Sequence, residues 1–322
     1  MEFQNSPKGL IVDLITPLSK GSDIDGRGLG RLLDRVVPFA QALLLASPHS
    51  GEGINLECEQ RLELLEKVIA VIRSRNIPLF IWVSQNTEEK TGETVLALEA
   101  GLQKRNYSGQ VTWVDTPLYY RSNRGLFNYY RELSAITMKP FILLNDPQFI
   151  QNLARPLKRL NIRTSILKEL VQIKAIQGMI FLGPIDRANN YYKASRINSD
   201  FRIYDGDEAQ FLSHPSMNGV TAVGANLSPE AWQKITNFSL KIAGEQNNYP
   251  DRLQQVWQIG QYLKNLKDIY DPAPVAIIKE VLSDMGIIET PTCTFEAGDL
   301  GIPKQQIKDL IANSGKGEYI NI

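Results

Sequence analysis

Eight short apolar runs alternate with helical patterns along the sequence, and this alternation constrains the fold more than any other feature. The run at 42–46 has no polar alternation, which is typical of a strand covered on both faces of a parallel sheet. No Gly-rich phosphate-binding fingerprint follows any run. The count therefore favours an α/β fold of the closed (β/α)8 (TIM) barrel type over an open dinucleotide-binding sheet. The predicted strands are 9–16, 42–46, 78–84, 111–115, 140–145, 177–183, 201–205 and 219–224.

From Pro229 onward the sequence predicts helices in place of strands. A chain of 322 residues is long enough for one large barrel with C-terminal additions. We therefore expect a barrel over residues 1–228 and a C-terminal helical region over residues 229–322 that packs on it. The helices predicted in this region are 232–238, 253–266, 275–285 and 305–311.

The charge balance gives no sign of a nucleic-acid or membrane-surface partner, because 35 Lys and Arg residues balance 35 Asp and Glu residues. The N-terminus lacks the basic segment and apolar core of a signal peptide, and the apolar runs are too short to cross a bilayer. Cys58 and Cys293 show neither metal-ligand spacing nor a disulfide framework. We expect a cytoplasmic location, no metal and no cofactor.

The polar turn after the second predicted strand is the first candidate site, because α/β barrels carry their chemistry at the carboxyl ends of the strands. A pKa near neutrality is typical of histidine and suits His49 to general-base work. A metal role would need converging ligands such as Asp13 and Asp115, and no local spacing supports that. Ser50 either binds a carboxylate or caps the next helix. Glu52 is expected to bind backbone amides across the barrel top.

Other strand ends carry further candidate residues. The tyrosines there either line a pocket or pack at a subunit contact, and we favour the contact. The asparagines are expected to hold turns through side-chain bonds to the backbone. The aspartates either cap a helix or do acid–base work. These residues are Tyr119, Tyr120, Asn145, Asn226, Asp205 and Asp207.

Seven segments, in order along the chain, carry motifs that occur together in one enzyme family. They are Ile-Thr-Pro-Leu at 15–18, Ser-Gly-Glu at 50–52, Thr-Pro-Leu-Tyr-Tyr at 116–120, Asn-Asp-Pro at 145–147, Asp-Gly-Asp at 205–207, Gly-Ala-Asn-Leu-Ser-Pro at 224–229 and the helical segment 278–286. From about residue 9 to 300 the chain resembles the dihydrodipicolinate synthase / N-acetylneuraminate lyase family of pyruvate-dependent aldolases. The resemblance implies a TIM barrel and a homo-oligomer, either a dimer or a tetramer.

The resemblance also implies a definite chemistry. In the family, a lysine on the sixth strand forms a Schiff base with pyruvate, which turns a carbonyl into an electron sink for making or breaking carbon–carbon bonds. A tyrosine transfers protons, and hydroxyls of the turn after the second strand bind the keto-acid carboxylate. In many members a second tyrosine reaches in from a neighbouring subunit. The implied partner is a small keto acid or another small carboxylate.

This sequence departs from the family pattern at the reactive positions. Ile180 follows Gly178 and Met179 where the lysine is expected, and Leu144 stands at the position of the catalytic tyrosine. Phe149 falls near the position of an arginine that often binds the carboxylate. The residues that the resemblance assigns to substrate binding are His49 and Ser50, which replace two threonines, and Tyr119, Tyr120, Asn145, Asp207 and Asn226.

We therefore expect a divergent family member without Schiff-base aldolase activity that binds a small carboxylate at the barrel mouth. Two alternatives stay open. An active lyase, acting on a carbon–carbon or carbon–oxygen bond, would need a displaced lysine such as Lys168, although helical spacing around that residue favours an outer face. A structural or partner-binding protein would have a mouth plugged by apolar side chains. Lys193 is expected on the surface.

Overall fold

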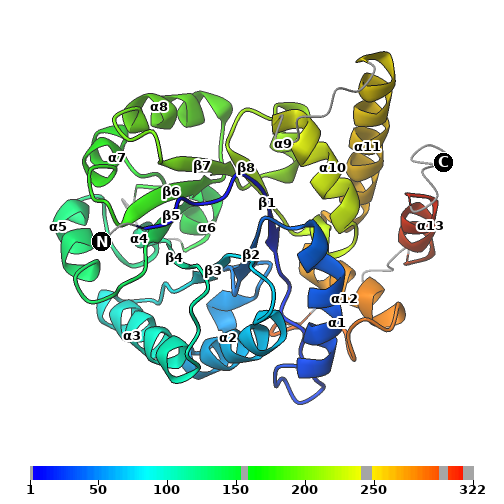
Figure 1. Ribbon diagram of the computed structural model, residues 1–322, viewed down its shortest axis with the longest axis horizontal. Helices are drawn as coiled ribbons and strands as arrows, with labels where there is room; N and C mark the ends of the chain where they lie inside the picture. The colour runs from blue at the N-terminus through cyan, green and yellow to red at the C-terminus, as the bar shows by residue number, and fades with distance from the viewer. Residues whose placement is uncertain (1–2, 154–158, 241–248, 297–303, 315–322) are drawn as a thin grey trace.

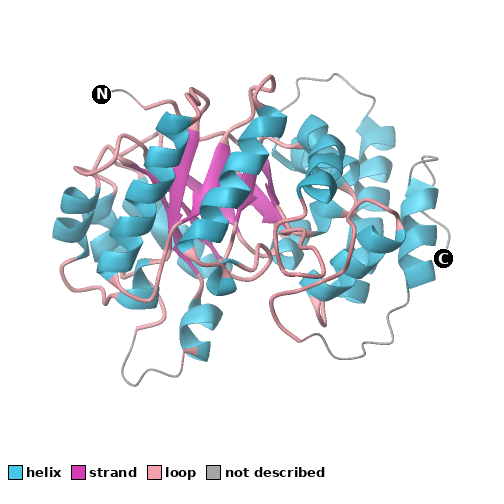
Figure 2. Cartoon of the chain, turned by 90° about the horizontal axis from the view of Figure 1, so that it is seen from below, coloured by secondary structure: helices cyan, strands magenta, loops and turns pink. Residues whose placement is uncertain are grey.

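The structure is a computed structural model that describes residues 3–153, 159–240, 249–296 and 304–314. Eight parallel strands form a closed barrel in the order β1 to β8, and β8 pairs with β1. Helices surround the strands, so the predicted (β/α)8 barrel is confirmed (Figures 1 and 2). The strands are β1 (Gly9–Asp13), β2 (Ala42–Leu45), β3 (Leu79–Trp82), β4 (Val111–Asp115), β5 (Phe141–Asn145), β6 (Ile176–Phe181), β7 (Arg202–Asp205) and β8 (Gly219–Ala222).

The helices of the eight strand–helix units are α1 (Gly26–Val36), α2 (Cys58–Ile72), α3 (Glu88–Lys104), α4 (Pro117–Tyr120), α5 (Leu126–Leu133), α6 (Pro147–Asn152), α7 (Thr164–Leu170), α8 (Ile185–Ser195), α9 (Glu208–Ser213) and α10 (Pro229–Leu240). Most of these helices surround the barrel, whereas the short helices α4 and α6 lie inside the ring of helices in this view (Figure 1). Three C-terminal helices lie to one side of the barrel: α11 (Tyr249–Tyr270), α12 (Pro274–Asp284) and α13 (Lys304–Ser314). No helix in the described ranges is long and apolar enough to span a membrane.

Three short helices, α4, α6 and α9, were not predicted from the sequence. They have four, six and six residues, which is too short for a helical period to show in the sequence. Each follows closely on the carboxyl end of a strand. They therefore shape the end of the barrel where the candidate residues lie.

Helix α10 packs on β1 and β8 and completes the eighth strand–helix unit. The expected boundary between residues 228 and 229 falls at the start of this helix. The division of the chain at that point into a barrel and a C-terminal helical region stays a proposal.

Strand pairing fixes which side chains face the interior, because residues paired across a parallel ladder project to the same side of the sheet. Ile180 of β6 pairs with Leu144 of β5 and with Tyr204 of β7. The Tyr204 ring contacts Phe80 of β3 with centroids 6.1 Å apart, which places this set inside the barrel. Followed around the barrel, the same register also turns inward Asp13, Leu44, Val114 and Thr221.

The connection from β2 to α2 folds back over the end of β2. A Cβ on Gly53 would lie 1.9 Å from the carbonyl oxygen of Ala46, so only glycine fits there. The buried guanidinium of Arg61 holds this connection: it donates to the carbonyl oxygens of Gly53 and Ser84 at 2.7 and 3.0 Å. It also lies over the Trp82 ring, 4.6 Å from the centroid.

A buried ion pair joins the same connection to the C-terminal helices. Lys279 of α12 pairs with Glu52, 227 residues away, and both side chains are 0% exposed. Lys279 also donates to the carbonyl oxygen of Thr292 at 2.7 Å. Glu52 accepts a hydrogen bond from the backbone amide of Thr294 at 2.6 Å, so its expected bond to a backbone amide is present. The lysine partner was not predicted.

We predict that Lys279→Met lowers the free energy of unfolding by about 3–5 kcal/mol, because the Glu52 carboxylate would stay buried without a counter-ion. The double variant Lys279→Met/Glu52→Gln should recover much of that loss. Chemical denaturation of the wild type, both single variants and the double variant measures the coupling. Lys193→Met, on an exposed face of α8, is the matched control and should change stability by less than about 0.5 kcal/mol. Equal losses in the Lys279→Met variant and the double variant would contradict the prediction.

Candidate functional site

The barrel mouth is the end of the barrel formed by the carboxyl ends of the strands and the connections that follow them. The turn after β2 brings His49 and Ser50 to this end. His49 is 55% exposed, and its Nε2 lies 3.6 Å from Oδ2 of Asp146. Its ring meets the edge of Phe149 with centroids 5.1 Å apart. A cavity of about 200 Å³ separates this turn from α12 and is lined by Pro48, His49, Glu52, Ile54, Asn55, Ala273, Pro274, Val275 and Phe295.

Asp13, the last residue of β1, is an acid that faces the barrel interior at the mouth. The hydroxyls of Ser47 and Ser50 and the ring of His49 lie close enough to its carboxyl group to lower the pKa of Asp13. The Oδ1 atom is shielded from solvent and has no hydrogen-bond partner among the described residues, although part of the residue stays accessible. Burial raises the pKa of Asp13 to about 6, against the opposing effect of the two hydroxyls and His49.

Sequence reasoning considered Asp13 only as a metal ligand and did not assign it to the site. The available signal was a single acid within an otherwise apolar strand, Gly-Leu-Ile-Val-Asp at 9–13. Its backbone is held by Asn226, whose Nδ2 donates to the Asp13 carbonyl oxygen at 2.8 Å and whose Oδ1 accepts from the Ile15 amide at 3.3 Å. Asn226 therefore holds the turn beside Asp13, as expected of it. In the described ranges, no three His, Cys, Asp or Glu side chains converge in a way that could hold a metal ion.

The two positions at which the family has reactive side chains are apolar and adjacent. Ile180 and Leu144 pair across β6 and β5, face the interior, and are 1% and 5% exposed. Lys168 lies on an exposed face of α7, outside the barrel, which argues against its use as the nucleophile of an active lyase. Lys193 is exposed on α8, as expected. Among the described residues Lys279 is the one buried lysine, and it is ion-paired with Glu52.

The predicted tyrosine pair divides between two environments. Tyr119 packs on Phe149, with ring centroids 5.1 Å apart, and lies 6.1 Å from Trp82. Tyr120 instead donates to Oδ2 of Asp115 at 2.7 Å, with the Tyr129 hydroxyl 2.8 Å away. Asp115 is on the outer face of β4, because its neighbour in the strand faces inward. The Tyr120 hydroxyl is therefore outside the barrel hollow.

The remaining predicted residues make contacts within the protein at the strand ends. Asn145 accepts from the Ile162 amide at 2.7 Å, and its Nδ2 donates to Asn161 at 2.9 Å. Asp207 caps α9 by accepting from the amides of residues 209 and 210. Ser50 does not cap the following helix, because α2 begins at Cys58 and a capping box of Glu57 and Gln60 closes its end. The structure thus brings His49, Ser50 and Asn226 close to Asp13, whereas Tyr120, Asn145 and Asp207 bond to other parts of the protein.

Two further buried acids flank the outside of β7 and β8. Burial raises the pKa of Asp205 to about 7, although it accepts hydrogen bonds from the Asp207 amide and the Gln210 side chain. Burial also raises the pKa of Glu208 to about 7. Glu208 accepts from the Tyr270 hydroxyl at 2.7 Å and from the Gly224 amide at 2.8 Å. It therefore links the barrel to the C-terminal helices.

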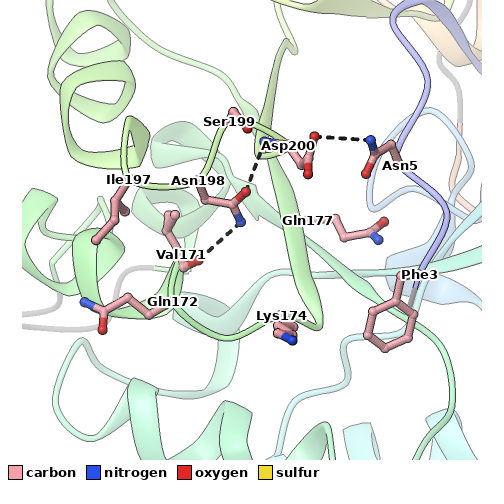
Figure 3. A pocket seen from close by; sticks show the side chains of 10 residues that line it. All are labelled: Phe3, Asn5, Val171, Gln172, Lys174, Gln177, Ile197, Asn198, Ser199 and Asp200. Carbon is pink, nitrogen blue, oxygen red and sulfur yellow. Dashed lines mark hydrogen bonds between the residues drawn. The ribbon is translucent and has the colours of Figure 1, made fainter. Parts of the chain in front are cut away.

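A cavity of about 580 Å³ lies at the opposite end of the barrel, next to the amino ends of β6 and β7 (Figure 3). Its polar side chains bond within the protein: Asn5 donates to Asp200 at 3.2 Å. Asn198 accepts from the Asp200 amide at 3.0 Å and donates to the Val171 carbonyl oxygen at 3.4 Å. These contacts brace the amino end of the barrel and do not mark a reactive site.

We predict that the protein loses stability as the pH rises from about 5 to 8. The folded pKa of Asp205 and of Glu208 lies above the ordinary values of 3.8 and 4.5, so the folded state binds more protons than the unfolded state across this interval. Each unit of such a shift corresponds to about 1.4 kcal/mol. Thermal unfolding at pH 5.5 and pH 8 measures the slope, which Asp205→Asn should flatten and Asp23→Asn, at an exposed acid, should leave unchanged. Stability that rises with pH over this range would contradict the assignment.

Comparison with known proteins connects this barrel to one family. The model of the dihydrodipicolinate synthetase family matches residues 6–300. The 4-hydroxy-tetrahydrodipicolinate synthase of Psychromonas ingrahamii is 26% identical over 293 residues, covering 88% of this chain and 90% of the relative. That of Methanococcoides burtonii is 24% identical over 309 residues, covering 94% and 98%.

Solved structures of the same family have this fold. Dihydrodipicolinate synthase from Bacillus anthracis aligns with a TM-score of 0.75 at 16% identity, covering 96% of this chain and 99% of the other. The chloride-inhibited enzyme from Acinetobacter baumannii, solved with pyruvate, aligns with a TM-score of 0.72 at 20% identity, covering 98% and 99%. At these identities the likeness is one of fold.

Proposed function

The chain belongs to the dihydrodipicolinate synthetase family, and we propose that it is a divergent member whose barrel does not perform imine-based aldolase chemistry. The observation that carries this proposal is the interior-facing Ile180 on β6, beside Leu144 on β5. A Schiff base needs a primary amine within bonding reach of a keto carbon. A branched hydrocarbon cannot supply one, and the apolar neighbour cannot transfer a proton.

An active lyase that uses a different amine is the second candidate function, and family membership favours it. Such an enzyme would act on a carbon–carbon or carbon–oxygen bond. Lys279 is the buried amine that would have to serve. Its ammonium is already occupied by Glu52 and by the Thr292 carbonyl oxygen, on a helix outside the strands, which argues against this role.

A structural or partner-binding protein is the third candidate. The buried side chains of Ile180 and Leu144 are consistent with a barrel mouth that apolar residues close. Asp13 argues for a site that has kept polar function, because an acid with a shielded, unpartnered oxygen is unfavourable in a mouth that has only to be filled.

A small carboxylate at the mouth remains part of the proposal, with a condition set by Asp13. The Ser50 hydroxyl, at one of the family's threonine positions, lies close enough to the Asp13 carboxyl group to lower its pKa. An ionised Asp13 would repel a ligand carboxylate, whereas a protonated one would donate a hydrogen bond to it. Carboxylate binding is therefore proposed for the protonated state of this acid.

We also propose that the protein is a homo-oligomer, a dimer or a tetramer, in the cytoplasm. Exposed apolar side chains such as Ile54, Trp257 and Phe295 provide contact surface and support assembly. Family membership alone does not set the oligomeric state, since one structural relative is described as a monomeric dihydrodipicolinate synthase variant.

We predict that borohydride reduction in the presence of pyruvate leaves the mass of the intact protein unchanged, because none of the strand residues that face the barrel interior in the described ranges is a lysine. Intact-protein mass spectrometry gives the readout. The 4-hydroxy-tetrahydrodipicolinate synthase of Pseudomonas aeruginosa, a relative at 24% identity, serves as the positive control. A lysine-linked pyruvate adduct in this protein would overturn the proposed function, and peptide mapping would identify the lysine.

We predict that pyruvate binds more tightly at pH 5 than at pH 7.5. The pKa of Asp13 is raised to about 6, so the carboxyl is mostly neutral at the lower pH and mostly ionised at the higher. Calorimetric titration at both values measures the difference, which should be at most about thirtyfold, because the protonated fraction of Asp13 falls from about nine-tenths to about one-thirtieth between them. Asp13→Asn, permanently neutral, should bind pyruvate alike at both values. Tighter binding to the wild type at pH 7.5 would exclude this carboxylate site.

A further inference from the structure

The cavity between the turn after β2 and helix α12 provides space that the proposed function does not use. Its volume is about 200 Å³, and it opens to solvent, because the wall residues Ile54 and Phe295 are 41% and 44% exposed. A cavity of about 150 Å³ with hydrocarbon walls is large enough to hold benzene, so one six-membered ring fits in this space. Ligands of drug size need roughly 300 Å³ or more, which limits the occupant to a single ring.

The walls of this cavity are mostly hydrocarbon. Among the described residues, the apolar side chains that line it are Pro48, Ile54, Ala273, Pro274, Val275 and Phe295. Ile54 and Phe295 expose large apolar side chains to water, and a ligand in the cavity would cover part of that surface. Removing apolar surface from water is favourable in proportion to its area, so the walls favour an apolar occupant.

One polar side chain on the wall is not engaged with the rest of the protein. Glu52 is paired with Lys279, and Asn55 donates to the Thr294 hydroxyl at 3.0 Å. The His49 ring makes no hydrogen bond to a described residue, since the 3.6 Å from its Nε2 to Oδ2 of Asp146 is too long for one. A neutral imidazole can donate one hydrogen bond and accept another, so it suits a ligand hydroxyl. No Lys or Arg is among the described residues that line the cavity, which favours a neutral ligand over an anion.

We propose that this cavity binds a small neutral phenol, with the aromatic ring against the apolar walls and the hydroxyl hydrogen-bonded to the His49 imidazole. A flat ring can pack on the Phe295 side chain and between the apolar residues on the two sides of the cavity, and pairs of aromatic rings attract one another beyond the area that they bury. The proposal does not rest on the proposed function, because none of the inward-facing strand residues in the described ranges lines this cavity.

The test is a proton NMR titration of the full chain with phenol at pH 7.5. The chain has two histidines, so a His214→Gln variant assigns the imidazole signals of each. Phenol should shift the His49 signals and leave those of His214, an exposed residue after α9, in place. Cyclohexanol has the same size and hydroxyl but no flat ring, and should bind about three- to tenfold more weakly than phenol.

Three variants locate the effect, and thermal unfolding confirms that each one folds. Ile54→Asp places a charge on the cavity wall and should weaken phenol binding at least about tenfold. Leu96→Asp is the matched control, because Leu96 is 49% exposed on α3 and does not line the cavity. His49→Phe keeps a ring but loses the hydrogen bond, so it should weaken phenol relative to toluene by about three- to tenfold.

Several outcomes would overturn the proposal. They are unchanged His49 signals in the phenol titration, equal affinities for phenol and cyclohexanol, and phenol binding that Ile54→Asp retains. Sedimentation of the wild type and the Ile54→Asp variant tests the other occupant, a second copy of the chain. An oligomer that excludes phenol and that Ile54→Asp dissociates would assign the cavity to that copy and overturn the proposal as well. A pyruvate adduct after borohydride treatment bears on the proposed function alone.

Discussion

Closure of the parallel hydrogen-bonded ladder decides which side chains meet inside this protein. Each strand is paired on both sides, so a shift of one residue in any strand would exchange its inner and outer faces. The register therefore fixes Ile180, Leu144 and Asp13 in the interior and turns Asp115 outward. Because the ring is closed, these positions cannot be rearranged one at a time. The chemistry available at the mouth follows from that arrangement.

The strand ends of this chain carry different residue types from those that the family resemblance implies. A lysine that forms an imine with pyruvate would bring a cation to β6, and this chain places hydrocarbon there and an acid on β1. The barrel scaffold does not require a lysine for its stability, because the interior positions are filled by well-buried apolar residues. The same fold can therefore be kept while the residues at the mouth change.

The sequence was sufficient to predict the eight strands, their parallel order and the barrel, because apolar runs and helical periods are local signals. The motifs also made it possible to predict that Leu144 and Ile180 stand at the positions of the family's tyrosine and lysine. Asp13 was not assigned to the site from the sequence. Whether its side chain points into the barrel depends on the register between β1 and its neighbouring strands, which local sequence does not show. The Glu52–Lys279 pair spans 227 residues and leaves no local trace. The position of Lys168, by contrast, could be predicted, because the helical spacing around it favoured the exposed outer face that the structure shows.

Tyr119 and Tyr120 are both held by contacts within their own chain. Tyr120 is bonded to Asp115 of its own chain, and Tyr119 is stacked on Phe149 of its own chain. Tyr120 is therefore committed to the buried cluster around Asp115, and moving its hydroxyl into the barrel hollow would first break its bond to that carboxylate.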